Sequence, residues 1–258
     1  MTDDPNHAAS HAALTDASGP LAGRVALVSG AASDIGRAVC MALGELGAHI
    51  RATDLAGARL AALQAELPEV ETVAVDLTAP VEVSALGLER VDIFASVAGL
   101  PVVERFLGSD PRAWESLWQV NLRAPMLLTQ AVAGGMSERG WGRLLYVSSD
   151  SARAGAGGEA VYAATKAGLL GFAKSVAREL APAGVTANVV CPGPIDTQAS
   201  RAILERRPRL RESLVRAIPA GALGTPMDVA GAIAYLCSPA ASYVTGQVLS
   251  VNGGITMS

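Results

Sequence analysis

The sequence predicts an α/β fold in which a doubly wound parallel sheet of about seven strands carries helices on both faces. Short runs rich in Val, Ile, Leu and Ala alternate with longer helical stretches along the whole chain. Several short runs are almost continuously apolar, which is typical of parallel strands covered by helices on both sides. The alternation indicates repeated strand–helix–strand units within one sheet.

Strands and helices are expected to follow one another without interruption. The expected strands are Val25–Ser29, His49–Thr53, Thr72–Val75, Val91–Ser96, Arg143–Ser148, Thr186–Val190 and Val248–Val251. The expected helices are Ile35–Leu46, Ala58–Leu67, Pro111–Glu138, Val161–Leu180, Gln198–Arg211 and Met227–Leu236. No internal repeat and no linker rich in Pro and Gly divides this pattern. We therefore expect a disordered tail over residues 1–20 and one Rossmann-type domain over residues 21–258.

The composition excludes several classes of protein. The chain has 258 residues and a net charge of −4, so electrostatics gives no reason to expect a nucleic-acid partner. No apolar run approaches the ~20 residues of a membrane helix, and the first residues lack the features of a signal peptide. The three cysteines are far apart and form no C-x-x-C pair. We expect no metal site, no membrane partner and a reducing, cytoplasmic location.

The first expected strand runs into a turn with the sequence Gly30-Ala-Ala-Ser-Asp-Ile-Gly36. Glycines permit a tight turn, and the free N–H groups of the following helix start can face the phosphates of a nucleotide. Gly30, Ser33, Asp34, Ile35 and Gly36 are therefore candidate cofactor-binding residues.

Asp34 stands where a middle glycine is usual in such turns. A carboxylate beside a pyrophosphate would repel it, whereas Asp at a helix start accepts backbone hydrogen bonds. We predict that Asp34 caps the helix and points away from the phosphates.

Asp54 follows the second expected strand, 18 residues beyond Gly36. A carboxylate here can accept hydrogen bonds from the adenosine ribose hydroxyls and would repel a 2′-phosphate. Neither Ser33 nor Leu55 supplies a cation for such a phosphate. Asp54 and Leu55 therefore predict a site for NAD(H) rather than NADP(H).

Tyr162 and Lys166 lie four residues apart in an expected helix, so they share one helix face. An ammonium near a phenol favours the phenolate and lowers the tyrosine pKa from its ordinary value of about 10. Such a tyrosine can exchange a proton with an alcohol or carbonyl oxygen. We predict this pair as the proton-transfer centre.

Ser149 ends an expected strand 13 residues before Tyr162, and Pro192-Gly193 follows the next strand. With these residues in register, residues 21–257 resemble the short-chain dehydrogenase/reductase family. The resemblance implies that Tyr162 is the general acid/base, that Lys166 holds the nicotinamide ribose and that Ser149 binds the reacting oxygen. Asn121 would hold a water molecule in the proton relay.

The resemblance also implies further contacts to the dinucleotide. Asp76 and Leu77 match residues near the adenine, and the segment Ser96-Val-Ala-Gly99 matches an N-N-A-G segment in which two asparagines are replaced here. The remaining implied cofactor contacts are Ser96, Ala98, Gly99, Tyr162, Lys166, Pro192, Gly193, Ile195 and Thr197.

The segment Arg201–Arg216 has six Arg and two Glu and follows the Pro-Gly segment, where the family carries its substrate lid. We expect a lid over about residues 197–216. Its charge fits either a solvated amphipathic helix pair or a site for the phosphate of CoA or of a carrier protein. The stretches Ser149–Gly155, Gly158–Tyr162 and Gly246–Gly254 are similar to those of 2-hydroxycyclohexanecarboxyl-CoA dehydrogenases in the family.

Three functions follow as alternatives. The first is an NAD-dependent dehydrogenase of a secondary alcohol, either cyclic or linked to CoA. The second is an enzyme like 3-oxoacyl-carrier-protein reductase, which would normally use NADPH. The third is a dinucleotide-binding regulator without catalysis. The resemblance further implies a homotetramer, and the helices Pro111–Glu138 and Val161–Leu180 are apolar enough to pack against a second subunit.

Overall fold

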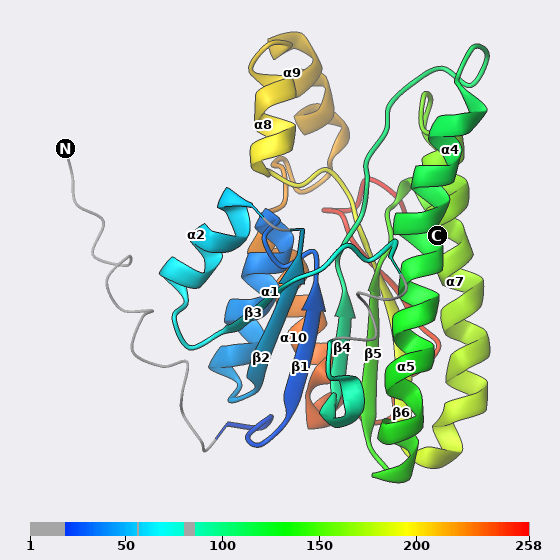
Figure 1. Cartoon of the computed structure of the whole chain (residues 1–258). Coiled ribbons are helices and arrows are strands. Elements are labelled where there is room, and N and C mark those ends of the chain that lie inside the picture. The colour runs from blue at the N-terminus through cyan, green and yellow to red at the C-terminus, as the bar shows by residue number, and fades with distance from the viewer. Residues whose placement is uncertain (1–18, 56, 80–85, 258) are drawn as a thin grey trace, which may run out of the picture.

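The structure is a computed structural model that describes residues 19–55, 57–79 and 86–257 (Figure 1). Seven parallel strands form one sheet in the order β3-β2-β1-β4-β5-β6-β7. The strands are β1 Val25–Ser29, β2 His49–Asp54, β3 Glu71–Ala74, β4 Ile93–Ser96, β5 Gly142–Val147, β6 Val185–Pro192 and β7 Val248–Val251. The predicted doubly wound α/β fold is confirmed.

Helices cover both faces of this sheet. The α-helices of the described ranges are α1 Asp34–Glu45, α2 Ala58–Glu66, α4 Pro111–Trp118, α5 Ala124–Glu138, α6 Ser151–Ala154, α7 Ala160–Leu180, α8 Gln198–Leu204, α9 Pro208–Ala217 and α10 Pro226–Cys237. Side chains of β1 alternate between two apolar cores: Ala26 and Val28 pack with α1 and α10, whereas Leu27 packs with α5 and α7. None of the helices in the described ranges is long and apolar enough to cross a membrane.

The order of the strands places a crevice at the carboxyl ends of β1 and β4. β1 pairs with β2 on one side and with β4 on the other. From β1 the chain continues outward through β2 and β3, and it then returns to the opposite side of β1 to form β4. At such a switch point the loops after the two neighbouring strands run in opposite directions, so there is room for a ligand between them. Ser29, Thr53 and Ser96 are paired in register at this edge, so the residues that follow them converge there.

The predicted helix Pro111–Glu138 is not regular. A π-helical turn over Gln119–Arg123 separates α4 from α5 and carries Asn121. Pro125 has no N–H to donate to the carbonyl of Asn121, so regular i→i−4 bonding cannot continue there. The wider turn was not predicted from the sequence.

The predicted helix Gln198–Arg211 is two helices. α8 ends at Leu204 and α9 begins at Pro208, where a proline fits the first helical position but interrupts a helix that reaches it from before. The two helices form a projection beyond the carboxyl edge of the sheet (Figure 1).

Residues 1–18 of the expected tail lie outside the described residues. Gly19 packs closely on the end of α1, since a Cβ there would lie 2.3 Å from the Leu46 carbonyl oxygen. Leu21 then donates its N–H to the same carbonyl at 2.9 Å. The described chain is therefore anchored from its first residues.

Candidate active site

The turn after β1 is built around two glycines. Gly30 has a φ of +69°, and a Cβ on it would lie 2.5 Å from the Ala98 backbone. A Cβ on Gly36 would lie 2.1 Å from the Gly30 carbonyl oxygen. Both positions therefore require glycine, because the turn, the start of α1 and the loop after β4 approach one another closely.

The predicted role of Asp34 as the cap of α1 is wrong. Ser33 is the N-cap, and its hydroxyl accepts a hydrogen bond from the Gly36 N–H at 3.0 Å. Asp34 is the first residue of α1, and its Oδ2 accepts the N–H of Gln198 at 2.5 Å. Gln198 begins α8, so the carboxylate contacts a helix far away in the sequence.

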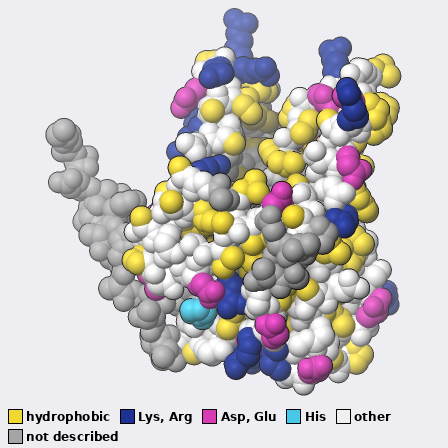
Figure 2. Space-filling view, viewed as in Figure 1, with side chains coloured by type: hydrophobic (Ala, Val, Ile, Leu, Met, Phe, Trp, Pro, Cys, Tyr) yellow, Lys and Arg dark blue, Asp and Glu magenta, His cyan; other side chains and the backbone are white. Residues whose placement is uncertain are grey.

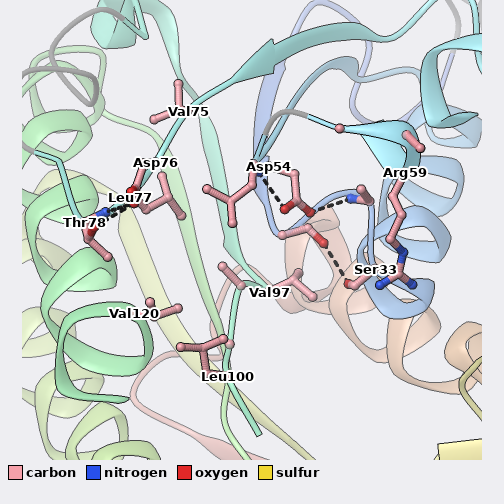
Figure 3. A pocket seen from close by; sticks show the side chains of 17 residues that line it. Ser33, Asp54, Arg59, Val75, Asp76, Leu77, Thr78, Val97, Leu100 and Val120 are labelled. Atoms are coloured by element: carbon pink, nitrogen blue, oxygen red, sulfur yellow. Dashed lines mark hydrogen bonds between the residues drawn. The ribbon is translucent and has the colours of Figure 1, made fainter. Parts of the chain in front are cut away.

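A pocket of about 500 Å³ lies in the crevice at the carboxyl ends of β1 and β4 (Figure 3). Of the predicted cofactor residues, it is lined by Gly30, Ser33, Asp54, Leu55, Asp76, Leu77, Ala98 and Gly99. The volume and the flanking helix start fit a dinucleotide.

Asp54 places its carboxylate in this pocket. Its Oδ2 accepts the Ala32 N–H at 2.9 Å, and its Oδ1 accepts the Leu55 N–H at 2.8 Å. These two backbone bonds fix the orientation of the carboxylate, and each oxygen keeps a further acceptor site for a ribose hydroxyl.

Asp76 has its carboxylate fixed in a similar way. Its Oδ1 accepts bonds from the N–H and the hydroxyl of Thr78, and these bonds lower the pKa of its carboxyl.

Arg59, in the first turn of α2, also lines the pocket (Figure 3). It was not predicted from the sequence as a pocket residue. Its position five residues after Asp54 in a helical segment was the available signal. Its guanidinium donates to Oε1 of Gln198 at 3.3 Å.

The other predicted cofactor residues do not line this pocket. Ile195 is buried and pairs with Gly224, and Thr197 is the N-cap of α8. Gly193 packs on Asn252, since a Cβ on it would lie 2.6 Å from the Asn252 Cβ. The remaining members of this set are Asp34, Ile35, Gly36, Ser96, Pro192, Tyr162 and Lys166.

Tyr162 and Ser149 come together as predicted from their spacing. Ser149 follows β5, and Tyr162 lies in the first turn of α7. Burial raises the pKa of Tyr162, the nearby Ser149 hydroxyl lowers it, and the negative charge of Glu159 raises it. The net direction is upward, so the phenol is protonated at neutral pH.

Lys166 makes its side-chain hydrogen bond with a strand and not with Tyr162. Its ammonium is buried and donates to the Val147 carbonyl at 2.9 Å. Burial lowers the pKa of Lys166 to about 8. The ammonium is also close to the dinucleotide pocket, because a Cβ on Gly99 would lie 2.9 Å from Nζ.

Asn121 is fully buried beside this group. Its Oδ1 accepts the Leu100 N–H at 2.8 Å, and its Nδ2 donates to the Leu100 carbonyl and to the Thr165 hydroxyl. Asn121 therefore ties the loop after β4 to α7, one residue from Lys166.

The segment after Ser149 is held by the C-terminal part of the chain. Asp150 is buried and accepts hydrogen bonds from Ser250 and Asn252. Its N–H donates to the Pro192 carbonyl at 2.9 Å. Arg153 adds a bond to the Ser250 hydroxyl at 2.9 Å. These contacts fix the backbone that carries Ser149.

A pocket at the switch point of a parallel sheet, together with the buried Lys166 and the half-buried Tyr162 four residues before it, defines a dinucleotide-binding oxidoreductase. The chain matches the family described as enoyl-(acyl carrier protein) reductase over residues 30–256. It belongs to the short-chain dehydrogenase/reductase family.

The matches to curated relatives cover nearly the whole length of those relatives. The chain is 36% identical to a 3-oxoacyl-[acyl-carrier-protein] reductase of Vibrio cholerae, a match that covers 92% of this chain and 99% of the relative. It is 37% identical to nodulation protein G of a Rhizobium species, with 92% and 98% covered.

Solved structures confirm the fold. A short-chain dehydrogenase/reductase from Burkholderia thailandensis has a TM-score of 0.85 and 36% identity, covering 90% of this chain and 92% of that one. A variant of actinorhodin polyketide ketoreductase, determined with NADPH, has a TM-score of 0.86 and 31% identity, covering 90% and 97%.

Proposed function

We propose that this protein reduces the ketone of a 3-oxoacyl thioester to a secondary alcohol, with Tyr162 as the proton donor. The placing of the Ser149 hydroxyl near the Tyr162 phenol, whose pKa is raised, carries the proposal. The upward shift of the phenol pKa keeps its proton available for a carbonyl oxygen, which suits reduction better than alcohol oxidation. Similarity to 3-oxoacyl-[acyl-carrier-protein] reductases supports the substrate class.

Each residue of the group has a defined part in this reaction. The bound nicotinamide cofactor supplies the hydride. Ser149 and Tyr162 bind the ketone oxygen with their hydroxyls, and Tyr162 passes its proton to that oxygen as it gains negative charge. Lys166 binds the nicotinamide ribose and stabilises the phenolate that remains. Asn121 holds the loop after β4 against α7.

Two observations favour different cofactors. The structural neighbour determined with NADPH supports NADPH, whereas the Asp54 carboxylate in the pocket disfavours a 2′-phosphate and supports NADH. We propose NADH, because Asp54 is held by two backbone bonds and cannot easily turn away.

The cofactor proposal is tested by comparing dissociation constants for NADH and NADPH by fluorescence titration. Wild type should favour NADH, and Asp54→Ser should shift the ratio toward NADPH by about tenfold or more. A wild-type preference for NADPH would refute the role of Asp54 and align the protein with its relatives.

A second candidate is oxidation of a cyclic alcohol or a hydroxyacyl-CoA with NAD, which Asp54 also favours. The lid supports a CoA-linked substrate, since Figure 2 shows cationic side chains at the tip of α8 and α9. Arg206, Arg207 and Arg209 are exposed there, and no ion pair holds them in the described part of the chain. A panel of 3-oxoacyl thioesters, hydroxyacyl-CoAs and cyclic alcohols separates the two candidates by catalytic efficiency.

We also propose a homotetramer in a reducing, cytoplasmic setting. A second hollow of about 500 Å³ lies between α5 and α7, and the half-exposed Trp118 and Met126 border it. Apolar surface of this kind favours a subunit contact. The three cysteines are free and buried, which suits a reducing compartment. Mass measurement in solution tests the oligomer.

A further inference from the structure

We infer that Asp34 is a positioning residue that holds the lid against the nucleotide turn and thereby sets the nicotinamide side of the cofactor site. The inference rests on the pocket being the dinucleotide site. It assigns a role to the carboxylate that stands where the turn would usually have glycine.

Gln198 is the point at which three parts of the fold meet. Its backbone N–H donates to Oδ2 of Asp34 from α1, and its side-chain oxygen accepts from Arg59 of α2. Ser33, next to Asp34, and Arg59 both line the pocket (Figure 3). The base of α8 is therefore held from both sides of the pocket rim.

The bond to Asp34 is stronger than an ordinary surface contact. The donor is the first N–H of α8, a group with no partner inside its own helix, and the acceptor is a charged carboxylate. Arg201 lies near Asp34 and is itself paired with Asp196 at 2.8 Å. That guanidinium offsets the negative charge of Asp34 at the edge of the pocket.

Holding Gln198 also places its neighbour Thr197. Thr197 begins α8 through a reciprocal capping arrangement with Ser200, so its position follows that of the helix. Thr197 is a predicted contact for the nicotinamide end of the cofactor. Asp34 therefore links the turn at the phosphate end of the site to a contact at the other end.

Cleavage of the lid by trypsin measures how often the lid opens. Trypsin cleaves after exposed arginines, and Arg206, Arg209 and Arg211 lie in the lid. Loss of the Asp34 bond should let this segment open and be cut faster. Arg112 in α4, whose side chain is 91% exposed, serves as an internal reference site. The cleavage sites are assigned by mass spectrometry.

Three variants are compared with wild type: Asp34→Ala, Asp34→Asn and the matched control Glu45→Gln. Glu45 is an exposed carboxylate at the other end of α1 with no contact to the lid. We expect Asp34→Ala to speed lid cleavage by about tenfold, the factor that about 1.4 kcal/mol produces. Asp34→Asn keeps an acceptor oxygen and should stay within about threefold of wild type, and Glu45→Gln should not differ.

Cofactor binding is measured on the same proteins by equilibrium fluorescence titration with NADH and NADPH. Asp34→Ala should weaken binding of either cofactor by about threefold or more, while Asp34→Asn restores most of it. Unchanged lid cleavage in Asp34→Ala would overturn the inference, as would faster cleavage with unchanged cofactor affinity. Tighter binding in both Asp34 variants would show that Asp34 only repels the pyrophosphate.

The cleavage assay needs neither cofactor nor substrate, so its result does not depend on the proposed reaction. If Asp34→Ala does not fold, Asp34→Asn and Gln198→Ala remain. Gln198→Ala removes the Arg59 bond and keeps the backbone bond, and it should raise lid cleavage by less than about threefold. If Gln198→Ala raises lid cleavage by more than tenfold, and by at least as much as Asp34→Asn does, the Arg59 bond anchors the lid instead of Asp34.

Discussion

Replacing Lys166 with Met should make the protein more stable while it abolishes activity. Lys166 is buried and its pKa falls from 10.5 to about 8, so the fold disfavours its charge. A shift of this size corresponds to about 3 kcal/mol at neutral pH. Met has a similar length and no charge, so it avoids this cost.

One contact is lost in the exchange. The Lys166 ammonium donates to the Val147 carbonyl at 2.9 Å, and leaving that carbonyl without a donor costs about 1 kcal/mol. The net gain is then about 2 kcal/mol at pH 7. In a protein of this size, that raises the midpoint of thermal unfolding by roughly 4–8 °C.

The lowered pKa of Lys166 also makes the stability of the wild-type protein depend on pH. Below pH 8, Lys166 is charged in both the folded and the unfolded chain, so the full cost is present. Between pH 8 and 10.5 the unfolded chain binds more protons than the folded chain, and wild-type stability rises with pH. The advantage of Lys166→Met should therefore shrink from pH 7 to pH 10.

Urea unfolding of both proteins at pH 7 and pH 10 measures this difference. A destabilised Lys166→Met at pH 7 would refute the reasoning, and so would an advantage that does not change with pH. Catalytic loss with higher stability would show that the ammonium is kept for function rather than for the fold.

Three further results are expected. Tyr162→Phe should lower turnover by about 10²–10⁴-fold with little change in cofactor affinity, and retained turnover would contradict its role as proton donor. Ketone reduction should decline above about pH 8, because Lys166 loses its charge there while Tyr162, whose pKa is raised, stays protonated; a flat rate up to pH 10 would separate Lys166 from the reaction. Joint replacement of Arg206, Arg207 and Arg209 by Gln should raise KM for an acyl-CoA substrate by roughly threefold to tenfold and leave that for the dinucleotide unchanged.

Local patterns in the sequence were enough to predict the strands and the dinucleotide turn. β1 was predicted over Val25–Ser29, as the structure has it, because an apolar run bounded by a charged residue and a glycine turn has few alternatives. Ser149 and Tyr162 could be paired because strand end and helix start are separated by a short segment. These features depend on residues close together in the chain.

Features that depend on distant partners could not be predicted in this way. The pattern around Asp34 predicts a cap for its own helix, but the N–H that Asp34 accepts lies 164 residues away. The carbonyl that accepts the Lys166 hydrogen bond belongs to Val147 of β5, 19 residues earlier in the chain, and the spacing of Tyr162 and Lys166 gives no sign of it. Arg59 lines the pocket from the first turn of α2, and nothing in the residues next to it indicates this. The π-helical turn at Asn121 follows from Pro125, which has no N–H to donate to the Asn121 carbonyl, and the apolar pattern of the segment does not indicate it.

The bonds from Ser250 and Asn252 to Asp150 make the reacting centre depend on a distant part of the sequence. Asn252 also donates to the Thr256 carbonyl at 2.8 Å, so nearly the last residues of the chain support the backbone of Ser149. Changes to the chain around Thr256 therefore disturb the segment that shapes the reacting centre, although Thr256 lies 107 residues after Ser149 in the sequence.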